Sequence, residues 1–296
     1  MRVFVTGASG HIGSAVVTEL LGAGHQVVGL ARSDSSAAAI TAAGAEVQRG
    51  DLRDLDAVRE AAAASDGVIH LAFEQLTADM AESLGTDLRA IEAIGTALEG
   101  SGKPFVGTNA SMTLSFLGGI TDRPATEQDV MPGGPRADAE NAVIALAEKN
   151  VRSSVVRVPP LVHSEHDRSG LFPMLVGIAR SRGVAGYAGD GANRWPAVHT
   201  LDIARLYRLA LEGAPAGSRL HAVAEDGLTL RELAEVIAAK LGVEAGSVAP
   251  EDFGPLAMFV ALDNPMSSEG TRRLLGWQPA GPTQAEDLGR AFYFTS

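Results

Sequence analysis

Short runs of apolar residues alternate with longer amphipathic segments through the first half of the chain. The short runs are bounded by glycine and polar residues, whereas apolar residues in the longer segments recur at helical spacing. This alternation predicts an α/β fold, with βαβ units around a doubly wound parallel sheet. The expected strands cover residues 2–6, 26–30, 46–48, 67–72, 104–108 and 153–158. The expected helices cover residues 14–22, the alanine-rich stretch 37–45, 79–99 and 136–149.

The alternation of short apolar runs and longer amphipathic segments ends after Pro159 and Pro160. Helical patterns cover residues 171–182, 201–212 and 229–241, a glycine-rich stretch "GYAGDGANRWP" interrupts them, and a loose tail is expected at the end. We therefore predict two units. Residues 1–158 form the sheet domain, and residues 159–296 form a smaller lobe that is partly interleaved with the sheet.

Composition narrows the class of protein. The 296 residues are 46% hydrophobic and 20% charged, as in an ordinary globular protein, and no apolar run approaches the roughly 20 residues of a membrane span. The formal net charge of −12 argues against nucleic acid or an anionic membrane as a partner. The absence of cysteine excludes disulfides and thiolate metal sites, which suits a cytoplasmic location. The sequence leaves open whether the chain is a monomer or a homodimer.

Three glycines mark the turn between the first strand and the first helix. Gly7 permits a tight turn, Gly10 lets the backbone approach a pyrophosphate, and Gly13 lets the helix pack closely on the strand. The helix N-terminus then favours the phosphate charge. The alternative is a tight turn that binds nothing. The strand-to-helix context favours a dinucleotide site.

The residues after the second strand indicate which dinucleotide binds. A carboxylate at this position accepts from a ribose 2′-hydroxyl, whereas a guanidinium pairs with a 2′-phosphate. Arg32 and Ser33 occupy the position, so we predict NADP(H). Two alternatives stay open: Arg32 is a solvated surface charge, or a shift of one residue brings Asp34 to the ribose.

The motifs together resemble one family. "TGASGHIG" at 6–13 is similar to the TGxxGxxG turn of extended and atypical short-chain dehydrogenases/reductases, and "GDLRD" at 50–54 to their adenine-side turn. "HLAF" at 70–73, "RVPPLVH" at 157–163, "GDGANRWPAVHTLDIARLY" at 189–207 and "TRRLLGWQP" at 271–279 extend the resemblance over nearly the whole chain. It implies a Rossmann fold with a substrate lobe. It also implies cofactor contacts from Gly7, Ser9, Gly10, His11, Ile12, Gly13, Arg32, Ser33, Asp51, Leu52, Leu71, Ala72, Phe73, Thr108, Pro159 and Val162.

The chain departs from the family at the catalytic acid. The family pattern implies a Tyr-x-x-x-Lys motif on the helix after the fifth strand. The three tyrosines here are Tyr187, Tyr207 and Tyr293, and none has lysine four residues later. Counting back from the sixth strand places the lysine position near Arg136 and the tyrosine position near Pro132. Proline supplies no proton.

Polar side chains do follow the fifth strand, in "VGTNASM". The hydroxyls of Thr108 and Ser111 are the candidate catalytic groups, because a hydroxyl can donate to a developing oxyanion. Alternatively, they cap the strand end. The residues predicted to contact substrate are Ser111, Met112, His163, Tyr187, Arg194 and Trp195. Trp195 has a second interpretation, in which it packs the lobe junction.

The segment "VHSEHD" contains His163, His166 and Asp167, whose spacing occurs in metal sites. No helix is expected to present them, so we predict no metal site.

Three functions fit these features. The leading hypothesis is an NADPH-dependent ketoreductase for a small apolar ketone. A phenolic hydroxyl beside the carbonyl, as in polycyclic aromatic polyketides, would supply the proton that the missing tyrosine cannot. The second is a non-catalytic NADP(H) sensor of the NmrA-like type, and the third is an isomerase or epimerase. The missing motif favours the sensor, whereas the substrate lobe and the hydroxyls favour the reductase.

Overall fold

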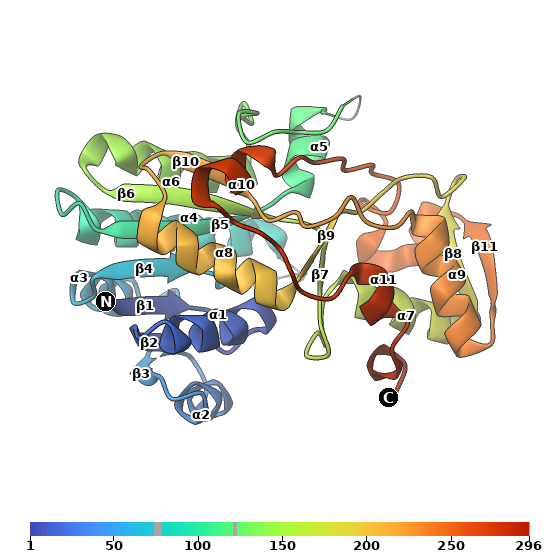
Figure 1. Ribbon diagram of the computed structural model, residues 1–296, viewed down its shortest axis with the longest axis horizontal. Coiled ribbons are helices and arrows are strands. Elements are labelled where there is room, and N and C mark those ends of the chain that lie inside the picture. The colour runs from blue at the N-terminus through green and yellow to red at the C-terminus, as the bar shows by residue number, and fades with distance from the viewer. Residues whose placement is uncertain (74–78, 121–122, 296) are drawn as a thin grey trace.

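A seven-stranded parallel sheet forms the centre of the fold (Figure 1), confirming the predicted α/β class. The computed structural model describes residues 1–73, 79–120 and 123–295. The sheet order is β10-β6-β5-β4-β1-β2-β3, so the strand order reverses beside β1. Its strands are β1 (Arg2–Thr6), β2 (Gln26–Ala31), β3 (Glu46–Arg49), β4 (Gly67–His70), β5 (Pro104–Ala110), β6 (Arg152–Val158) and β10 (Ser218–His221).

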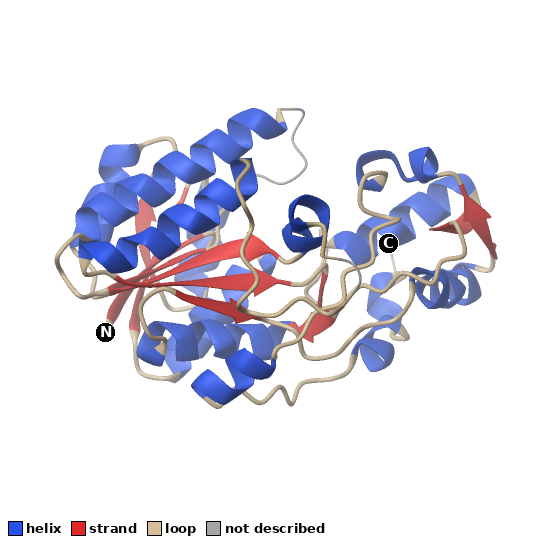
Figure 2. Cartoon of the chain, turned by 90° about the horizontal axis from the view of Figure 1, so that it is seen from above, coloured by secondary structure: helices blue, strands red, loops and turns tan. Residues whose placement is uncertain are grey.

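Helices cover both faces of this sheet (Figure 2). One face packs on α1 (His11–Gly22), α2 (Asp34–Ala42) and α8 (Thr200–Gly213) around a shared apolar core. The opposite face packs on α3 (Leu55–Ala63), α4 (Met80–Leu98) and α6 (Pro135–Ala145), which runs into the 3₁₀ helix η1 (Leu146–Lys149). Short α5 (Met112–Gly118) follows β5 at the carboxyl edge. Ligands of such sheets bind at this edge, where the strand order reverses.

The chain after residue 158 contributes to two places. Its α8 and β10 belong to the sheet layers, so the sheet contains segments of both predicted units. The remainder builds a smaller lobe with its own apolar core. That lobe contains α7 (Leu171–Arg182), α9 (Leu230–Leu241), η2 (Pro250–Leu256), and the pair β8 (Val184–Ala188) and β11 (Glu244–Val248). A second short pair, β7 (Leu161–His163) with β9 (Ala197–His199), connects the lobe to the sheet.

The tail is more ordered than the sequence predicted. It contains α10 (Glu269–Leu275), α11 (Gln284–Leu288) and η3 (Ala291–Tyr293). The backbone between α10 and α11 is fastened to α8, because Ala280 and Gly281 donate their N–H groups to the Asp202 carboxylate at 2.8 and 2.9 Å. The Trp277 indole also donates to the Asp202 carbonyl. The prediction of a loose tail is therefore wrong, since these partners lie some 75 residues away in sequence.

Within the described part of the chain, no helix is both long and apolar enough to cross a membrane.

Candidate functional site

The glycine turn has the geometry of a pyrophosphate site. Gly7 has a φ of +69°, and a Cβ there would lie 2.8 Å from the Ala72 nitrogen. A Cβ on Gly13 would lie 1.9 Å from the Gly7 oxygen. A Cβ on Gly10 would meet only the Gly7 oxygen, at 3.2 Å. The fold therefore requires Gly7 and Gly13, whereas Gly10 leaves an open face, and no side chain caps α1. These residues fit a dinucleotide phosphate group.

The side chain of His11 packs behind this turn. Its Nε2 lies 3.2 Å from the Val162 carbonyl oxygen and 3.1 Å from the Thr200 hydroxyl. Burial lowers the pKa of His11. The imidazole thus joins the turn to β7 and α8, which leaves the His11 backbone as the part able to bind phosphate. The neighbouring Ser9 is exposed, and Ile12 packs on the core of the sheet.

On the adenine side, Arg32 and Ser33 are exposed directly after β2. The Ser33 hydroxyl caps α2 by accepting from the Ser36 N–H at 3.2 Å. The Asp34 carboxylate forms an ion pair with Arg49 of β3. Asp34 thus already has a cationic partner, which argues against the alternative in which Asp34 meets the ribose.

The next adenine-side residues, Asp51 and Leu52, lie in the turn before α3. The Asp51 carboxylate accepts from the Arg53 N–H at 2.9 Å, and Leu52 packs against the core of the α3 face. The turn is thereby held in one conformation beside β2 and β3.

A buried chain of hydrogen bonds begins at Thr6, at the end of β1. The N–H groups of Leu71 and Ala72 both donate to its hydroxyl oxygen at 3.2 Å. The Thr6 hydroxyl also lies 2.8 Å from Nδ1 of His70, to which it donates, since its oxygen accepts from the two amides. His70 then carries its proton on Nε2, 3.1 Å from Asp87 on α4. These hydrogen bonds hold the backbone of Leu71 and Ala72, which is predicted to line the cofactor.

This chain of hydrogen bonds ends on Arg136, in the first turn of α6. Its Nη1 donates to the second oxygen of Asp87 at 2.8 Å, and its guanidinium lies 4.1 Å from the centre of the Phe73 ring. Burial lowers the pKa of Arg136, and the charge of Asp87 opposes that shift. Counting back from the sixth strand placed Arg136 at the family's lysine position. No sequence motif around Asp87 indicates that it pairs with Arg136. Pro132 lies in the loop before α6, not on the helix.

The hydroxyl of Thr108 is already engaged. It donates to the His70 carbonyl at 2.7 Å and lies 2.8 Å from the Tyr207 hydroxyl. A threonine has one hydroxyl proton, so Tyr207 donates to Thr108. Burial raises the pKa of Tyr207. Thr108 therefore has no proton free for a substrate. Tyr207, which the sequence did not single out, lies beside it.

Ser111 and Met112 are buried beneath the carboxyl edge. Ser111 has no exposed surface, and its hydroxyl accepts from the Asn264 amide at 2.8 Å. Met112 belongs to the core of the smaller lobe. The prediction that these side chains touch substrate is corrected, because the bond from Ser111 to Asn264 and the packing around both side chains enclose them. Pro159 is also buried, whereas Ala110 is exposed at this edge.

The other predicted substrate residues do not converge on one place. His163 is buried, and its Nδ1 lies 2.8 Å from Asp287 of α11. Trp195 is fully buried in the smaller lobe and donates to the Leu262 carbonyl, so the packing interpretation replaces that of a substrate wall. Tyr187 lies under the Arg231 guanidinium, whose central carbon is 4.9 Å from the centre of the Tyr187 ring. Arg194 is exposed beside Gly227.

Apolar side chains join α5 to the smaller lobe. The rings of Phe116 and Phe259 are 6.4 Å apart between centres, and Phe116 is 47% exposed. The adjacent Met258 is 60% exposed. Apolar surface is therefore available where the lobe approaches the carboxyl edge.

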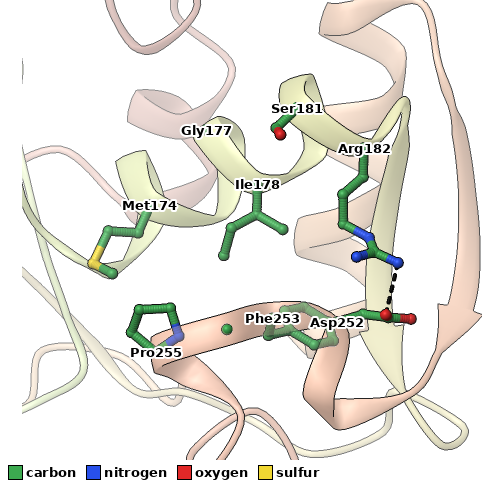
Figure 3. Close-up of a pocket in the computed structure, with 9 residues that line it drawn as sticks. Met174, Gly177, Ile178, Ser181, Arg182, Asp252, Phe253 and Pro255 are labelled. Atoms are coloured by element: carbon green, nitrogen blue, oxygen red, sulfur yellow. Dashed lines mark ion pairs between the residues drawn. The ribbon is translucent and has the colours of Figure 1, made fainter.

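A separate cavity of about 400 Å³ lies between α7 and η2 (Figure 3). Met174, Ile178 and Pro255 line it, and the ion pair of Arg182 with Asp252, at 2.7 Å, lies at one end. None of the predicted site residues lines it, so this cavity is distinct from the cofactor site. Among the described residues, no group of three or more histidine and acidic side chains is arranged to hold a metal ion.

A family model and several known proteins are similar to this chain. A sequence model of the NAD dependent epimerase/dehydratase family matches residues 3–97. An uncharacterised protein of Schizosaccharomyces pombe is 43% identical over 300 residues, which cover 99% of this chain and 100% of the relative. A 2-alkyl-3-oxoalkanoate reductase of Stenotrophomonas maltophilia is 29% identical over 257 residues, covering 82% of this chain and 76% of the relative.

A dTDP-glucose 4,6-dehydratase from Streptomyces venezuelae has the same fold, with a TM-score of 0.80 at 23% identity over 99% of this chain and 97% of that one. The fold and the glycine turn thus define an NAD(P)-binding oxidoreductase of Rossmann type. The chain belongs to the extended short-chain dehydrogenase/reductase family.

Proposed function

We propose that the protein is an NADPH-dependent ketoreductase. The observation that supports this most directly is the open face of Gly10 between two glycines that the fold itself requires. Bound NADPH supplies a hydride for reduction of a carbonyl. The glycine turn would hold the pyrophosphate, Arg32 and Ser33 the ribose phosphate, and Leu71, Ala72 and Phe73 the wall of the site.

We propose an apolar ketone as the substrate. The exposed surface of Phe116 and Met258 supports this, because it offers no charge to a polar sugar or phosphate. The relative named 2-alkyl-3-oxoalkanoate reductase acts, by its name, on an alkyl ketone that bears a carboxylate. Apart from that carboxylate, the alkyl chains of such a ketone are apolar, as are the rings of a polycyclic aromatic ketone. The matched family description also includes epimerases, and this alternative predicts turnover with no net loss of NADPH.

The test is consumption of NADPH, followed by its ultraviolet absorbance, with a panel of alkyl and aromatic ketones. We expect steady oxidation with at least one apolar ketone. Gly10→Val is the matched control: Gly10 has a φ of −77°, which any residue adopts, and its Cβ requires only a shift of the Gly7 oxygen, while its side chain occupies the phosphate position. Circular dichroism checks that this variant is folded. Turnover that is equal in the two proteins, or absent with every ketone, would contradict the proposal.

Cofactor preference is a separate prediction. NADP(H) should bind more tightly than NAD(H), and Arg32→Ala should remove most of that preference. A charge-assisted contact contributes roughly 1.5–3 kcal/mol, which corresponds to about ten- to a hundredfold in Kd. Titration of each cofactor by calorimetry measures it. Arg59→Ala is the control, since Arg59 is exposed on α3 and paired with Asp56. Equal affinities of the parent protein for both cofactors would refute the assignment.

A further inference from the structure

We propose that Arg136 is the group that stabilises the carbonyl oxygen of the substrate, and that Asp87 and His70 are the residues that position it. This inference rests on the proposed ketoreductase function. It assigns to a guanidinium at the family's lysine position the hydrogen bond to the carbonyl oxygen that a tyrosine would donate.

The position of Arg136 supports this role. Phe73 follows β4, and Tyr207 bonds to Thr108 of β5. Arg136 lies against the Phe73 ring and bonds to Asp87, which also lies 3.1 Å from Nε2 of His70, the last residue of β4, and the pKa of Arg136 responds to the nearby Tyr207. The guanidinium therefore lies at the carboxyl ends of β4 and β5. Ligands of this fold class react at this edge.

The orientation of Arg136 is fixed on two sides. One nitrogen donates to Asp87, and one face is covered by Phe73. Yet 18% of the side chain is exposed, and among the described residues its second terminal nitrogen has no hydrogen-bond partner. A guanidinium has five N–H donors and no acceptor. At least one donor edge is thus left for a ligand oxygen.

The charge of Arg136 is balanced before any substrate binds. Asp87 of α4 neutralises the guanidinium, and Glu140 lies one turn along α6. His70 donates to Asp87, and Tyr207 of α8 is neutral because burial raises its pKa. A neutral ion pair with preset N–H donors suits a dipole that gains charge during the reaction.

The hydroxyls near this edge do not offer an equivalent donor. The Thr108 proton is donated to the His70 carbonyl, and Tyr207 donates to Thr108. Ser111 is enclosed and has no exposed surface. Compared with these hydroxyl groups, Arg136 retains both a free N–H and exposed surface among the described residues at the ends of β4 and β5.

The reduction balances without a protein acid. The carbonyl carbon would receive the hydride that bound NADPH would supply, and the π electron pair would move onto the oxygen. Arg136 donates a hydrogen bond to this oxygen and keeps its own proton. Water then protonates the alkoxide, so the products are an alcohol, hydroxide and NADP⁺.

The kinetic test replaces Arg136 by lysine and by methionine, with the ketone of the panel that the parent protein reduces fastest. We expect Arg136→Met to lower kcat about a hundredfold or more, as for loss of one oxyanion donor. Arg136→Lys should retain part of that rate, and added guanidinium ion should restore part of it in Arg136→Met. NADPH affinity should change less than threefold. Arg89→Gln is the control, because Arg89 is an exposed arginine of α4, the helix that carries Asp87, and bonds to Thr86.

A binding test uses no turnover. The probe is 4-nitrophenol, whose phenolate oxygen mimics the alkoxide and whose visible absorbance reports its ionisation. It is titrated into the NADP⁺ complex of each protein. We expect the pKa of the bound phenol to fall in the parent protein and in Arg89→Gln, but not in Arg136→Met. Circular dichroism confirms that each variant is folded. No ionisation by the parent protein, or equal ionisation in Arg136→Met, would overturn the assignment of Arg136.

The positioning role of Asp87 has its own readout. Asp87→Asn removes the charge that holds the pKa of Arg136 up against burial. We therefore expect the loss of kcat on the alkaline side to begin at lower pH than in the parent protein. An unchanged pH profile would show that Asp87 is merely structural. If NADPH is oxidised normally by Arg136→Met, only this inference fails. If the parent oxidises no NADPH with any ketone, the proposed function fails with it.

Discussion

At the scale of single residues, the structure separates side chains that face a ligand from those that hold the site together. Thr108 was predicted as catalytic because hydroxyls after the fifth strand suit an oxyanion. Its proton instead fastens β5 to the His70 carbonyl, and its oxygen accepts from the buried Tyr207. The sequence therefore predicted where this hydroxyl lies, near the end of β5. The use of the hydroxyl depended on a tyrosine 99 residues further along the chain.

This arrangement predicts a compensating pair. Thr108→Val should lower the free energy of unfolding by about 1–3 kcal/mol, because the Tyr207 hydroxyl is left buried without a partner. Adding Tyr207→Phe should recover part of that loss, since both polar groups are then gone. Urea denaturation of the parent, both single variants and the double variant measures the coupling. Strictly additive losses would contradict the direct hydrogen bond.

At the scale of secondary-structure elements, β10 is held by polar contacts rather than by a long strand. The N–H of His221 donates to Thr271 of α10 at 2.7 Å. The His221 ring lies 2.7 Å from the Ser267 carbonyl through Nδ1, and Nε2 lies 3.1 Å from the Arg157 guanidinium. The ring is thus neutral, donating through Nδ1 and accepting through Nε2. Burial and the charge of Arg157 lower the pKa of His221 to about 4.

The lowered pKa predicts a specific acid sensitivity. An unfolded histidine takes up a proton near its ordinary pKa of 6.5, whereas the folded form does so only near 4. The unfolded state therefore binds more protons between these values, and stability falls as the pH drops through this window. We expect a loss of about 2 kcal/mol from pH ~6.5 to ~5. Urea denaturation across this range measures it in the parent protein and in His221→Gln.

The variant will be less stable at neutral pH, because two side-chain hydrogen bonds are lost. Its stability should nevertheless depend less on pH in this range. His11 and His199, whose pKa values are also lowered by burial, account for the dependence that remains. An identical pH dependence in the two proteins would exclude His221 as a source.

At the scale of the whole molecule, the sequence predicted what is local and missed what joins distant segments. The sheet, α7 and the glycine turn follow from periodicity and from glycines with short-range roles. The pairing of β7 with β9 and of β8 with β11 depends on strands of three to five residues, too short for a clear pattern. In the same way, the burial of Ser111 and Trp195 depends on Asn264 and Leu262, which the sequence does not place beside them.

The tail offers the last prediction, because one carboxylate fastens it to the sheet layers. Asp202 of α8 accepts from the N–H groups of Ala280 and Gly281 and lies beside Trp277. Asp202→Asn keeps the size but replaces one acceptor by an amide donor that opposes these N–H groups. We expect stability to fall by about 1–3 kcal/mol. Hydrogen exchange should accelerate most over residues 277–288, since the tail is released before the sheet opens. Arg136 and the glycine turn lie outside this contact, so NADPH affinity should be retained. Equal acceleration of exchange in the tail and in β5 would mean that the tail and the sheet unfold as one unit. That outcome would contradict the prediction that the hydrogen bonds of Asp202 hold the tail separately.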